Sequence, residues 1–274
     1  MVQTAEAPAA QPKTAAPPAA APDEATAQRL EAERLYHNSR FGAEEDPRAH
    51  LDKLYAVLRP AFDAQDDLVR GLGAGKDVLE YGCADGSLAL RELGVPRFAR
   101  SFLGIDISDA AIDKANARAA EMGFANARFA AMNAEALEVP DASLDLVYGR
   151  GIIHHLDLSR CFPEVARVLR PGGSAVFAEP LGHNPVLNWY RSRTPELRTH
   201  DEHPLVMDDL ELGRRFFSDV SARYFGLTAL AAVPLRNTPL GGPALRALGA
   251  LDRAIFAVPP LRKQAWYALI TLRK

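Results

Sequence analysis

Short apolar runs alternate with longer runs of helical spacing from residue 77 to the end of the chain. Apolar runs that end in glycine or in a polar side chain are typical of strands buried on both faces. This alternation predicts an α/β fold with a mostly parallel sheet and helices on both faces. The pattern predicts strands at about 78–81, 102–107, 127–131, 144–148, 174–179, 220–227 and 265–272, and helices at 88–93, 110–122, 161–169 and 207–217.

The first 27 residues are dominated by Ala and Pro and hold almost no large apolar side chain. Such a composition cannot bury enough surface to fold, so we expect a disordered tail over 1–27 and one domain over 28–274. Two helices are expected before the first strand, at about 25–41 and 48–62, with a break near Pro60 at the end of the second.

The overall composition is that of an ordinary globular protein, with 48% hydrophobic and 24% charged residues. The formal net charge of −3 gives no excess of positive charge, so nucleic acid is not an expected partner. The two cysteines, Cys83 and Cys161, suggest neither a disulfide framework nor a zinc cluster, which favours the reducing cytoplasm. No apolar run is long enough to span a bilayer.

The stretch 77–87 reads as a buried strand that ends in an acid, Glu80, and then breaks into a glycine turn. Gly82 and Gly86 permit backbone angles and close approaches that a Cβ would block. A strand, a glycine turn and a helix together form a ligand cradle, because backbone N–H groups face the ligand. The spacing does not fit G-x-G-x-x-G, since Ala84 and Ser87 fall where glycines would be required, and this argues against a nicotinamide-dependent oxidoreductase.

The spacing of these residues, acid-x-Gly-x-small-x-Gly, resembles the first motif of S-adenosylmethionine-dependent methyltransferases of the Rossmann-like class, with Ala84 in place of the usual middle glycine. The resemblance implies a seven-stranded sheet whose last strand is antiparallel, and S-adenosyl-L-methionine as the cofactor. It implies that Glu80, Gly82, Ala84 and Gly86 surround the methionine end. It also implies a cofactor-binding half at about 72–180 and substrate-shaping insertions at about 181–205 and 228–263.

The ends of the next strands carry further candidate cofactor contacts. Asp106, about 20 residues past the turn, is placed to accept hydrogen bonds from both ribose hydroxyls, with Ile107 beside it. Ser108 already fits the role of capping the following helix, which argues against a capping role for Asp106. Asn133 stands where the family places a polar side chain near the adenine amino group, with Ala134 next to it. Arg150, at the end of the fourth strand, completes this candidate set.

Two loops that leave strand ends carry candidate substrate-side residues. His154 and His155 follow the fourth strand, and a histidine of near-neutral pKa can take a proton from an attacking hydroxyl or amine. The alternative is that one of them orients a backbone or packs on the cofactor. After the fifth strand come Glu179, His183 and Asn184, which are candidates for the base and for acceptor contacts unless they are simply solvated. In the resemblance the leading helices help close the site, so Tyr36, His37 and Tyr55 could face the pocket, with Tyr36 as an acceptor candidate; the alternative is that they are ordinary core or surface residues.

The remaining polar and amphipathic segments add weaker signals. The segment 200–203 holds two His, an Asp and a Glu, but no compact ligand spacing appears, so no metal is expected. Apolar residues at helical spacing within 228–263 indicate a helix that covers the sheet edge or forms a dimer contact. A surface that meets a membrane or a lipidic substrate is the less favoured alternative. The oligomeric state is not predicted.

These residues together predict a methyltransferase that transfers a methyl group from S-adenosylmethionine to an O or N nucleophile of a small molecule, in specialised or in cofactor or lipid metabolism. The protein's main task would be to align nucleophile, methyl group and sulfur and to exclude water. The alternative is a non-catalytic partner or sensor that binds the cofactor. An oxidoreductase is the third and weakest interpretation.

Overall fold

The computed structural model describes residues 24–42, 52–194 and 202–274. Most of the tail expected at 1–27 therefore lies outside the described residues, but its last four residues already belong to the first helix. The strands are β1 (Asp77–Tyr81), β2 (Ser101–Asp106), β3 (Ala127–Ala131), β4 (Leu144–Arg150), β5 (Leu169–Pro180), β6 (Asp219–Phe225) and β7 (Tyr267–Arg273).

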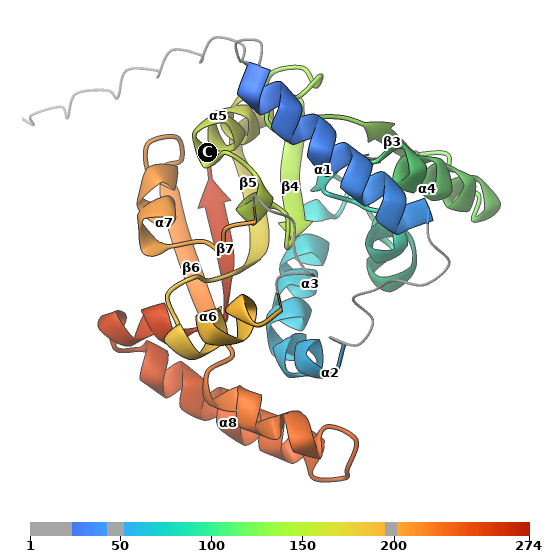
Figure 1. Cartoon of the computed structure of the whole chain (residues 1–274). Helices are drawn as coiled ribbons and strands as arrows, with labels where there is room; N and C mark the ends of the chain where they lie inside the picture. Colours follow the sequence, from blue (N-terminus) through green and yellow to red (C-terminus); the bar gives the residue numbers. More distant parts are fainter. Residues whose placement is uncertain (1–23, 43–51, 195–201) are drawn as a thin grey trace, which may run out of the picture.

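Helices and single helical turns connect these strands (Figure 1). The longer helices are α1 (Glu24–Gly42), α3 (Arg59–Gly73), α4 (Asp109–Glu121), α5 (Leu158–Val168), α6 (Pro185–Ser192), α7 (Met207–Gly213) and α8 (Gly241–Phe256). The shorter elements are α2 (Asp52–Tyr55), η2 (Ala56–Leu58), η3 (Leu88–Leu93), η4 (Val95–Arg97), η5 (Ile153–His155), η7 (Thr228–Leu235) and η8 (Pro259–Gln264).

The seven strands form one sheet in the order β3-β2-β1-β4-β5-β7-β6. All neighbouring pairs are parallel except those that β7 makes with β5 and β6, which are antiparallel. The expected fold, with its antiparallel last strand, is confirmed. Glu80 of β1 pairs in register with Gly104 of β2 and Tyr148 of β4, so these three strands end at the same edge of the sheet.

The core fills both faces of the sheet because successive strand side chains point to opposite sides. Leu79, Tyr81 and Val147 pack on one face with apolar residues of α5 and α7. Val78 and Tyr148 pack on the other face with residues of α3, η3 and α4. Figure 1 shows α1 as a separate outer helix, and its residues line one cavity with Gly82, Asp106 and Arg150 at the carboxyl ends of the strands.

The described part of the helix expected at 48–62 is divided into α2, η2 and the start of α3, so a break lies close to Pro60, as expected. Pro60 does not end a helix but stands in the first turn of α3, which continues to Gly73. A proline is tolerated there because the first backbone N–H groups of a helix have no intrahelical partner and its fixed φ suits the helix. Residues 48–51 lie outside the described residues.

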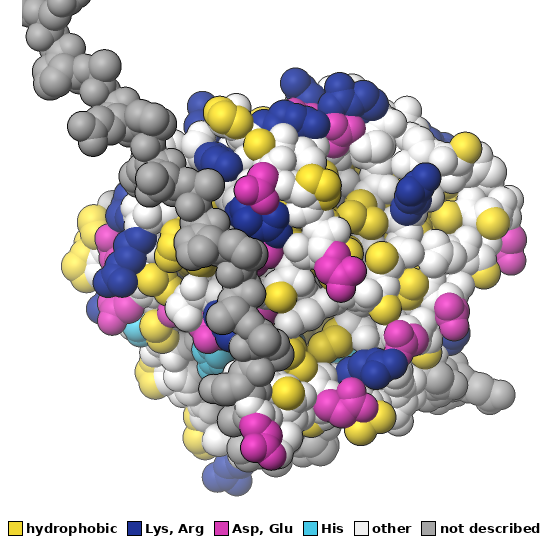
Figure 2. Space-filling model, turned by 90° about the horizontal axis from the view of Figure 1, so that it is seen from above, with side chains coloured by type: hydrophobic (Ala, Val, Ile, Leu, Met, Phe, Trp, Pro, Cys, Tyr) yellow, Lys and Arg dark blue, Asp and Glu magenta, His cyan; other side chains and the backbone are white. Residues whose placement is uncertain are grey.

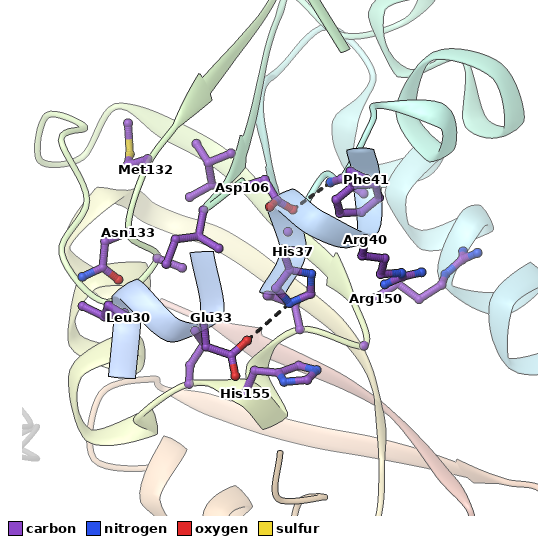
Figure 3. A pocket seen from close by; sticks show the side chains of 18 of the residues that line it. Leu30, Glu33, His37, Arg40, Phe41, Asp106, Met132, Asn133, Arg150 and His155 are labelled. Atoms are coloured by element: carbon purple, nitrogen blue, oxygen red, sulfur yellow. Dashed lines mark hydrogen bonds and ion pairs between the residues drawn. The ribbon is translucent and has the colours of Figure 1, made fainter. Parts of the chain in front are cut away.

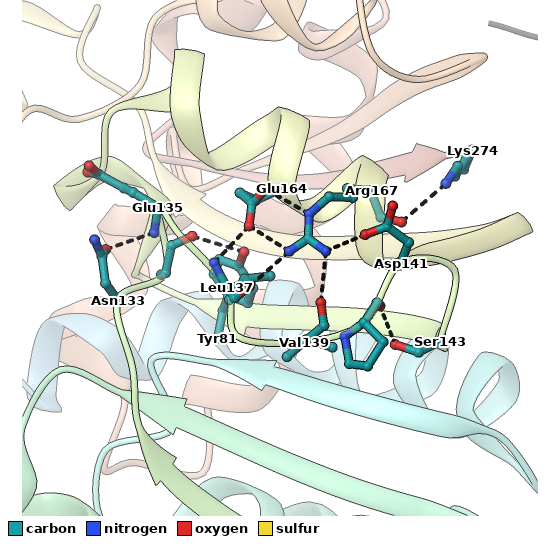
Figure 4. A network of polar contacts seen from close by, with 12 residues as sticks. Tyr81, Asn133, Glu135, Leu137, Val139, Asp141, Ser143, Glu164, Arg167 and Lys274 are labelled. Atoms are coloured by element: carbon teal, nitrogen blue, oxygen red, sulfur yellow. Dashed lines mark hydrogen bonds and ion pairs between the residues drawn. The ribbon is translucent and has the colours of Figure 1, made fainter. Parts of the chain in front are cut away.

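A buried polar network joins α5 to the loop before β4 (Figure 4). The Arg167 guanidinium donates to both carboxylate oxygens of Glu164, to Asp141 Oδ1 at 2.6 Å, and to the carbonyls of Val139 and Leu137 at 2.8 and 2.9 Å. Glu164 Oε2 also accepts the Leu137 N–H at 2.7 Å. One arginine therefore provides hydrogen bonds to several polar groups of the loop between β3 and β4.

The outer helix α8 contains Gly249, and a Cβ built there would meet nothing within 4 Å. Glycine in a helix interior costs backbone entropy without any packing reason at this position. We expect Gly249→Ala to raise the free energy of unfolding by about 0.5–1 kcal/mol, measured by urea denaturation. An unchanged or lowered stability would show that α8 does not have the conformation described.

The charged side chains are mixed on the face seen in Figure 2. Lys and Arg lie among Asp and Glu, with hydrophobic side chains between them and no broad patch of one sign. The absence of a nucleic-acid partner stays a prediction from the net charge. No helix in the described parts of the chain is both long and apolar enough to cross a membrane.

Candidate active site

A cavity lies where α1 crosses the carboxyl ends of β1, β2, β3 and β4 (Figure 3). Its floor comes from the strand ends and the loops that follow them, and its roof comes from α1. The lining residues from the sheet side are Gly82, Ala84, Ile105, Asp106, Ile107, Met132, Asn133, Ala134, Arg150, Gly151, Ile152, His155 and Leu156; those from α1 are Arg29, Leu30, Glu33, His37, Arg40 and Phe41.

The glycine turn after β1 forms part of the cavity floor and packs closely against its neighbours. Gly82 has a φ of +63°, and a Cβ there would lie 2.8 Å from the Ile152 side chain. Ala84 also has a positive φ, of 48°, which is uncommon for a residue with a side chain and stores strain. Gly86 brings the turn against Ala115, which a Cβ would meet at 3.1 Å.

Asp106 supports this turn as well as facing the cavity. Its Oδ2 accepts the Ala84 N–H at 2.9 Å and its Oδ1 accepts the Ser108 N–H at 3.0 Å. Each carboxylate oxygen can accept a second hydrogen bond, so both retain capacity for a ligand. Ser108 caps α4 by accepting from Ala111, as the sequence predicted.

Glu80 is buried one layer behind the cavity and is not part of its lining. Burial raises the pKa of Glu80 well above its usual value. Its Oε2 has no hydrogen-bond partner among the described residues. An unpaired buried carboxylate oxygen behind a glycine turn fits a site that is completed by a cationic group.

Arg150 and Asn133 are held in place at opposite sides of the cavity. Arg150 donates to Gln65 Oε1 at 2.8 Å and to Asp66 Oδ1 at 2.5 Å, both on α3, and its guanidinium lies 4.5 Å from the Phe62 ring centroid. Asn133 Oδ1 accepts the Glu135 N–H at 2.9 Å, which fixes the direction of its amide.

The two histidines after β4 have different surroundings. His155 lines the cavity, whereas His154 does not. His154 Nδ1 lies 2.7 Å from Glu179 Oε2, and Glu179 Oε1 accepts the N–H groups of Ile152 and Ile153 at 3.0 and 3.1 Å. Burial raises the pKa of Glu179 to about 8. Glu179 and His154 thus shape the loop that presents His155.

Two other predicted acceptor-side residues make local structural contacts. His183 Nε2 accepts the Met207 N–H at 2.9 Å at the start of α7. Asn184 Oδ1 accepts the N–H groups of Val186 and Leu187, and so caps α6. Tyr36 contacts His37 edge to face, with ring centroids 5.3 Å apart.

The structure therefore gathers only part of the predicted set around one cavity. Of the residues singled out from sequence, Gly82, Ala84, Asp106, Ile107, Asn133, Ala134, Arg150 and His155 line it. Glu80, Gly86, His154, His183, Glu179, Asn184 and Tyr36 are not among the lining residues.

The face of α1 adds lining residues, above all His37, which the sequence analysis named as a candidate, and Glu33, which it missed. His37 Nε2 lies 3.3 Å from Glu33 Oε2, and the rings of His37 and His155 have centroids 6.3 Å apart (Figure 3). The helical spacing of Leu30, His37 and Phe41 was readable, and Glu33 lies on the same side by its i,i+4 relation to His37.

Polar contacts attach α1 to the rest of the site. Arg29 Nη2 donates to Glu135 Oε1 at 2.6 Å, and Arg34 pairs with Asp109 of α4 at 2.5 Å. Ser108 Oγ donates to Asn38 Oδ1 at 2.7 Å. These contacts hold a helix of weak amphipathic character over the cavity.

His154, His155 and Glu202 bring potential metal-ligand atoms within 4.8 Å of one another. Glu202 is separated in sequence from the two histidines, so spacing alone did not reveal this group. His154 Nε2 and Glu202 Oε1 are 3.8 Å apart, the distance of an ion pair when the histidine is protonated. The absence of a metal stays a prediction.

Comparison with known proteins agrees with this site. Residues 78–173 match the model of a family described as methyltransferase domain. A probable S-adenosylmethionine-dependent methyltransferase of Mycolicibacterium smegmatis is 36% identical over 108 residues, which is 39% of each chain. The 27-O-demethylrifamycin SV methyltransferase of Amycolatopsis mediterranei is 36% identical over 138 residues, covering 48% of this chain and 50% of that one.

The fold is also shared with a solved structure. Geranyl diphosphate methyltransferase, in complex with geranyl diphosphate and sinefungin, superposes with a TM-score of 0.60 at 17% identity, over 90% of this chain and 99% of that one. The matches to the curated relatives reach half of their length or less.

The matched domain and the fold are those found in Rossmann-like methyltransferases of the S-adenosylmethionine-dependent class. The resemblance carried by the stretch from Glu80 to Gly86 is confirmed, and with it the fold class and S-adenosyl-L-methionine as the cofactor.

Proposed function

We propose that this chain transfers the methyl group of S-adenosylmethionine to an oxygen or nitrogen nucleophile of a small molecule. The observation that carries this proposal is that one cavity joins the cofactor-side residues of four strand ends to His155. The name of the Amycolatopsis relative refers to a rifamycin, and this supports a small-molecule acceptor.

The residues of the cavity floor fit the parts of this cofactor. Asp106 would accept from the ribose hydroxyls with the acceptor capacity that its two backbone contacts leave. Asn133, Met132 and Ala134 would contact the adenine ring. Glu80, behind Gly82, would offset the positive charge of the methionine end, because its carboxylate is buried without a full set of partners. When bound, the cofactor supplies a methyl group activated by a positive sulfur.

His155 is the candidate base that this geometry favours over His154 and His183. It lines the cavity, and a neutral imidazole there can take the proton of an attacking hydroxyl or amine. His37, paired with Glu33, lies across from it and would orient the acceptor or hold water out. Tyr36, Glu179 and Asn184 do not line the cavity, so they would influence the acceptor through neighbouring residues and not by direct contact.

The proposal also includes the domain organisation of the chain and its cellular compartment. We assign 28–274 to one domain, with the cofactor half at about 72–180 and acceptor-shaping segments at about 181–205 and 228–263. Cys83 and Cys161 are both buried free thiols, and burial raises the pKa of each well above its usual value. Buried unreactive thiols suit a reducing compartment, and we therefore propose the cytoplasm.

The proposal is tested by following a labelled methyl group from S-adenosylmethionine into a small-molecule extract incubated with the purified chain. We expect labelled product, and we expect His155→Ala to lower its rate by about 100-fold or more, the usual contribution of a general base. His183→Ala is the matched control and should stay within a few-fold of the parent chain, since its ring contacts Met207 and not the cavity.

Loss of activity in His183→Ala with retention in His155→Ala would reverse the assignment of the base. Absence of labelled product with the parent chain across aqueous and organic fractions would count against catalysis. It would favour a protein that binds the cofactor without turnover.

A further inference from the structure

Large hydrophobic side chains are exposed mainly in one part of the molecule. Nine such side chains are exposed in the described residues, and seven of them belong to α6 or to the segment 240–261 around α8. Single exposed apolar residues are ordinary, whereas a contiguous group marks an interaction surface. We call this group the apolar edge: Val186, Trp189, Tyr190, Leu240, Leu251, Val258 and Leu261.

The helix α8 is apolar on both sides, which a helix that merely covers a sheet does not require. Its inner side buries Phe256 and Asp252, whose carboxylate accepts the N–H groups of Leu227, Thr228 and Ala229. At about 100° per residue the opposite side holds residues three or four positions apart. These outward residues are Pro243, Ala247, Ala250, Leu251, Ala254 and Val258, all exposed and all without charge.

The helix α6 carries a second group of exposed apolar residues, near the end of this segment. Val186, Trp189 and Tyr190 are spaced i, i+3 and i+4 and are exposed together, while Leu187 is buried. Asn184 Nδ2 donates to the Gln264 carbonyl at 2.7 Å, which ties the start of α6 to the end of η8. Figure 1 shows α6 beside the α8 region at the end of the molecule away from α1.

The charge of this region is opposite to that of the rest of the chain. Residues 184–194 and 226–266 hold seven Lys and Arg and one acid, the buried Asp252, against 25 Lys and Arg and 34 Asp and Glu elsewhere. Arg246 and Arg253 flank the outward side of α8, and Lys263 is exposed beside Leu261. A basic rim around exposed aliphatic and Trp side chains is complementary to an anionic lipid surface.

The sheet topology places this region at the carboxyl edge of the sheet, the edge at which the cavity lies. β6 runs parallel to β5, because both pair antiparallel with β7, so η7 and α8 leave β6 at the carboxyl edge. The chain returns from η8 into β7, where Tyr267 pairs with Pro180 and Phe225. Asp106 and Arg150 lie at the same edge, and therefore the apolar edge and the cavity share one side of the fold.

We propose that the apolar edge docks the protein onto an anionic lipid bilayer, with α6 and α8 lying in the interface plane. Trp189, Leu251 and Val258 enter the headgroup region, and Arg246, Arg253 and Lys263 contact lipid phosphates. One consequence rests on the proposed methyl transfer, namely that the acceptor is a small molecule held in or at the bilayer.

The full chain is sedimented with vesicles of phosphatidylcholine alone and of phosphatidylcholine mixed with phosphatidylglycerol, without cofactor or acceptor. We expect binding to the anionic vesicles only, weakened as salt is raised because the charges are exposed. Absence of binding to the anionic vesicles at low salt would overturn the proposal. Because no turnover is measured, this outcome is independent of whether the methyltransferase proposal holds.

Substitutions in the apolar edge and elsewhere on the surface test which residues bind the vesicle. Leu251→Asp and the pair Arg246→Gln with Arg253→Gln should each weaken vesicle binding by about tenfold or more. The matched controls are Leu35→Asp, at a side chain 60% exposed on α1, and the pair Arg70→Gln with Arg91→Gln. Their affinity for the anionic vesicles should stay within about twofold of that of the parent chain. Equal effects of edge and control variants would overturn the assignment. A concentration-dependent dimer that Leu251→Asp dissociates, without vesicle binding, would assign the surface to a second copy instead.

Discussion

Replacing Asp106 by Ala should lower the affinity for S-adenosylmethionine by about 100-fold or more. A carboxylate that accepts from two vicinal hydroxyls makes two charge-assisted hydrogen bonds, each contributing about 1.5–3 kcal/mol. Asp106 also accepts the Ala84 N–H, and Ala84 has a left-handed backbone that needs support. The substitution therefore removes ligand contacts and loosens the turn beneath the ligand.

The control for this variant is Asp113→Ala, which removes an exposed carboxylate from α4 without touching the cavity. Both proteins are titrated calorimetrically, and thermal melting without ligand checks that each is folded. A folded Asp106→Ala protein that binds S-adenosylmethionine as tightly as the Asp113→Ala protein would show that Asp106 does not hold the ribose.

Replacing Arg167 by Ala should lower the free energy of unfolding by about 3–5 kcal/mol, the usual range for breaking a buried ion pair from one side. The variant leaves Glu164 buried without its cation, and the carbonyls of Leu137 and Val139 lose their donor. The loop before β4 then keeps the Leu137 N–H contact to Glu164 and the backbone contacts of Ala142 and Ser143 to α5.

Urea denaturation with an unchanged m-value measures this effect. Arg214→Ala is the matched control, since Arg214 forms an exposed i,i+3 pair with Glu211 and should cost less than about 0.5 kcal/mol. Glu164→Leu combined with Arg167→Met should recover part of the loss, because no unpaired buried charge remains. A loss in Arg167→Ala no larger than that in Arg214→Ala would contradict the role of the network.

The strands and the cofactor side of the site were readable from sequence because both depend on local pattern. An apolar run followed by an acid or an amide places that polar group at a strand end, and parallel strands bring their ends together. Asp106 and Asn133 were found in this way. The second role of Asp106, as acceptor for Ala84, joins residues 22 apart and is set by the pairing of β1 with β2.

The residues that contact the methyl acceptor were harder to predict from sequence, because polar side chains in the loops had several possible hydrogen-bond partners. Asn184 precedes Pro185, and this Asn-Pro pair is a helix start signal that accounts for its capping of α6. Glu33 was missed, and His37 was only one of several candidates, because α1 covers a cavity and not a core, so its apolar stripe is weak. Their proximity to His155 depends on a fold that joins residues more than 100 positions apart.

The most direct test of the account is a calorimetric titration of the full chain with S-adenosylmethionine and S-adenosylhomocysteine, beside NADH. We predict binding of both sulfur compounds at roughly micromolar dissociation constants and no heat of binding with NADH. Binding of NADH, with neither sulfur compound bound, would contradict the assignment of the cavity below α1 to this cofactor.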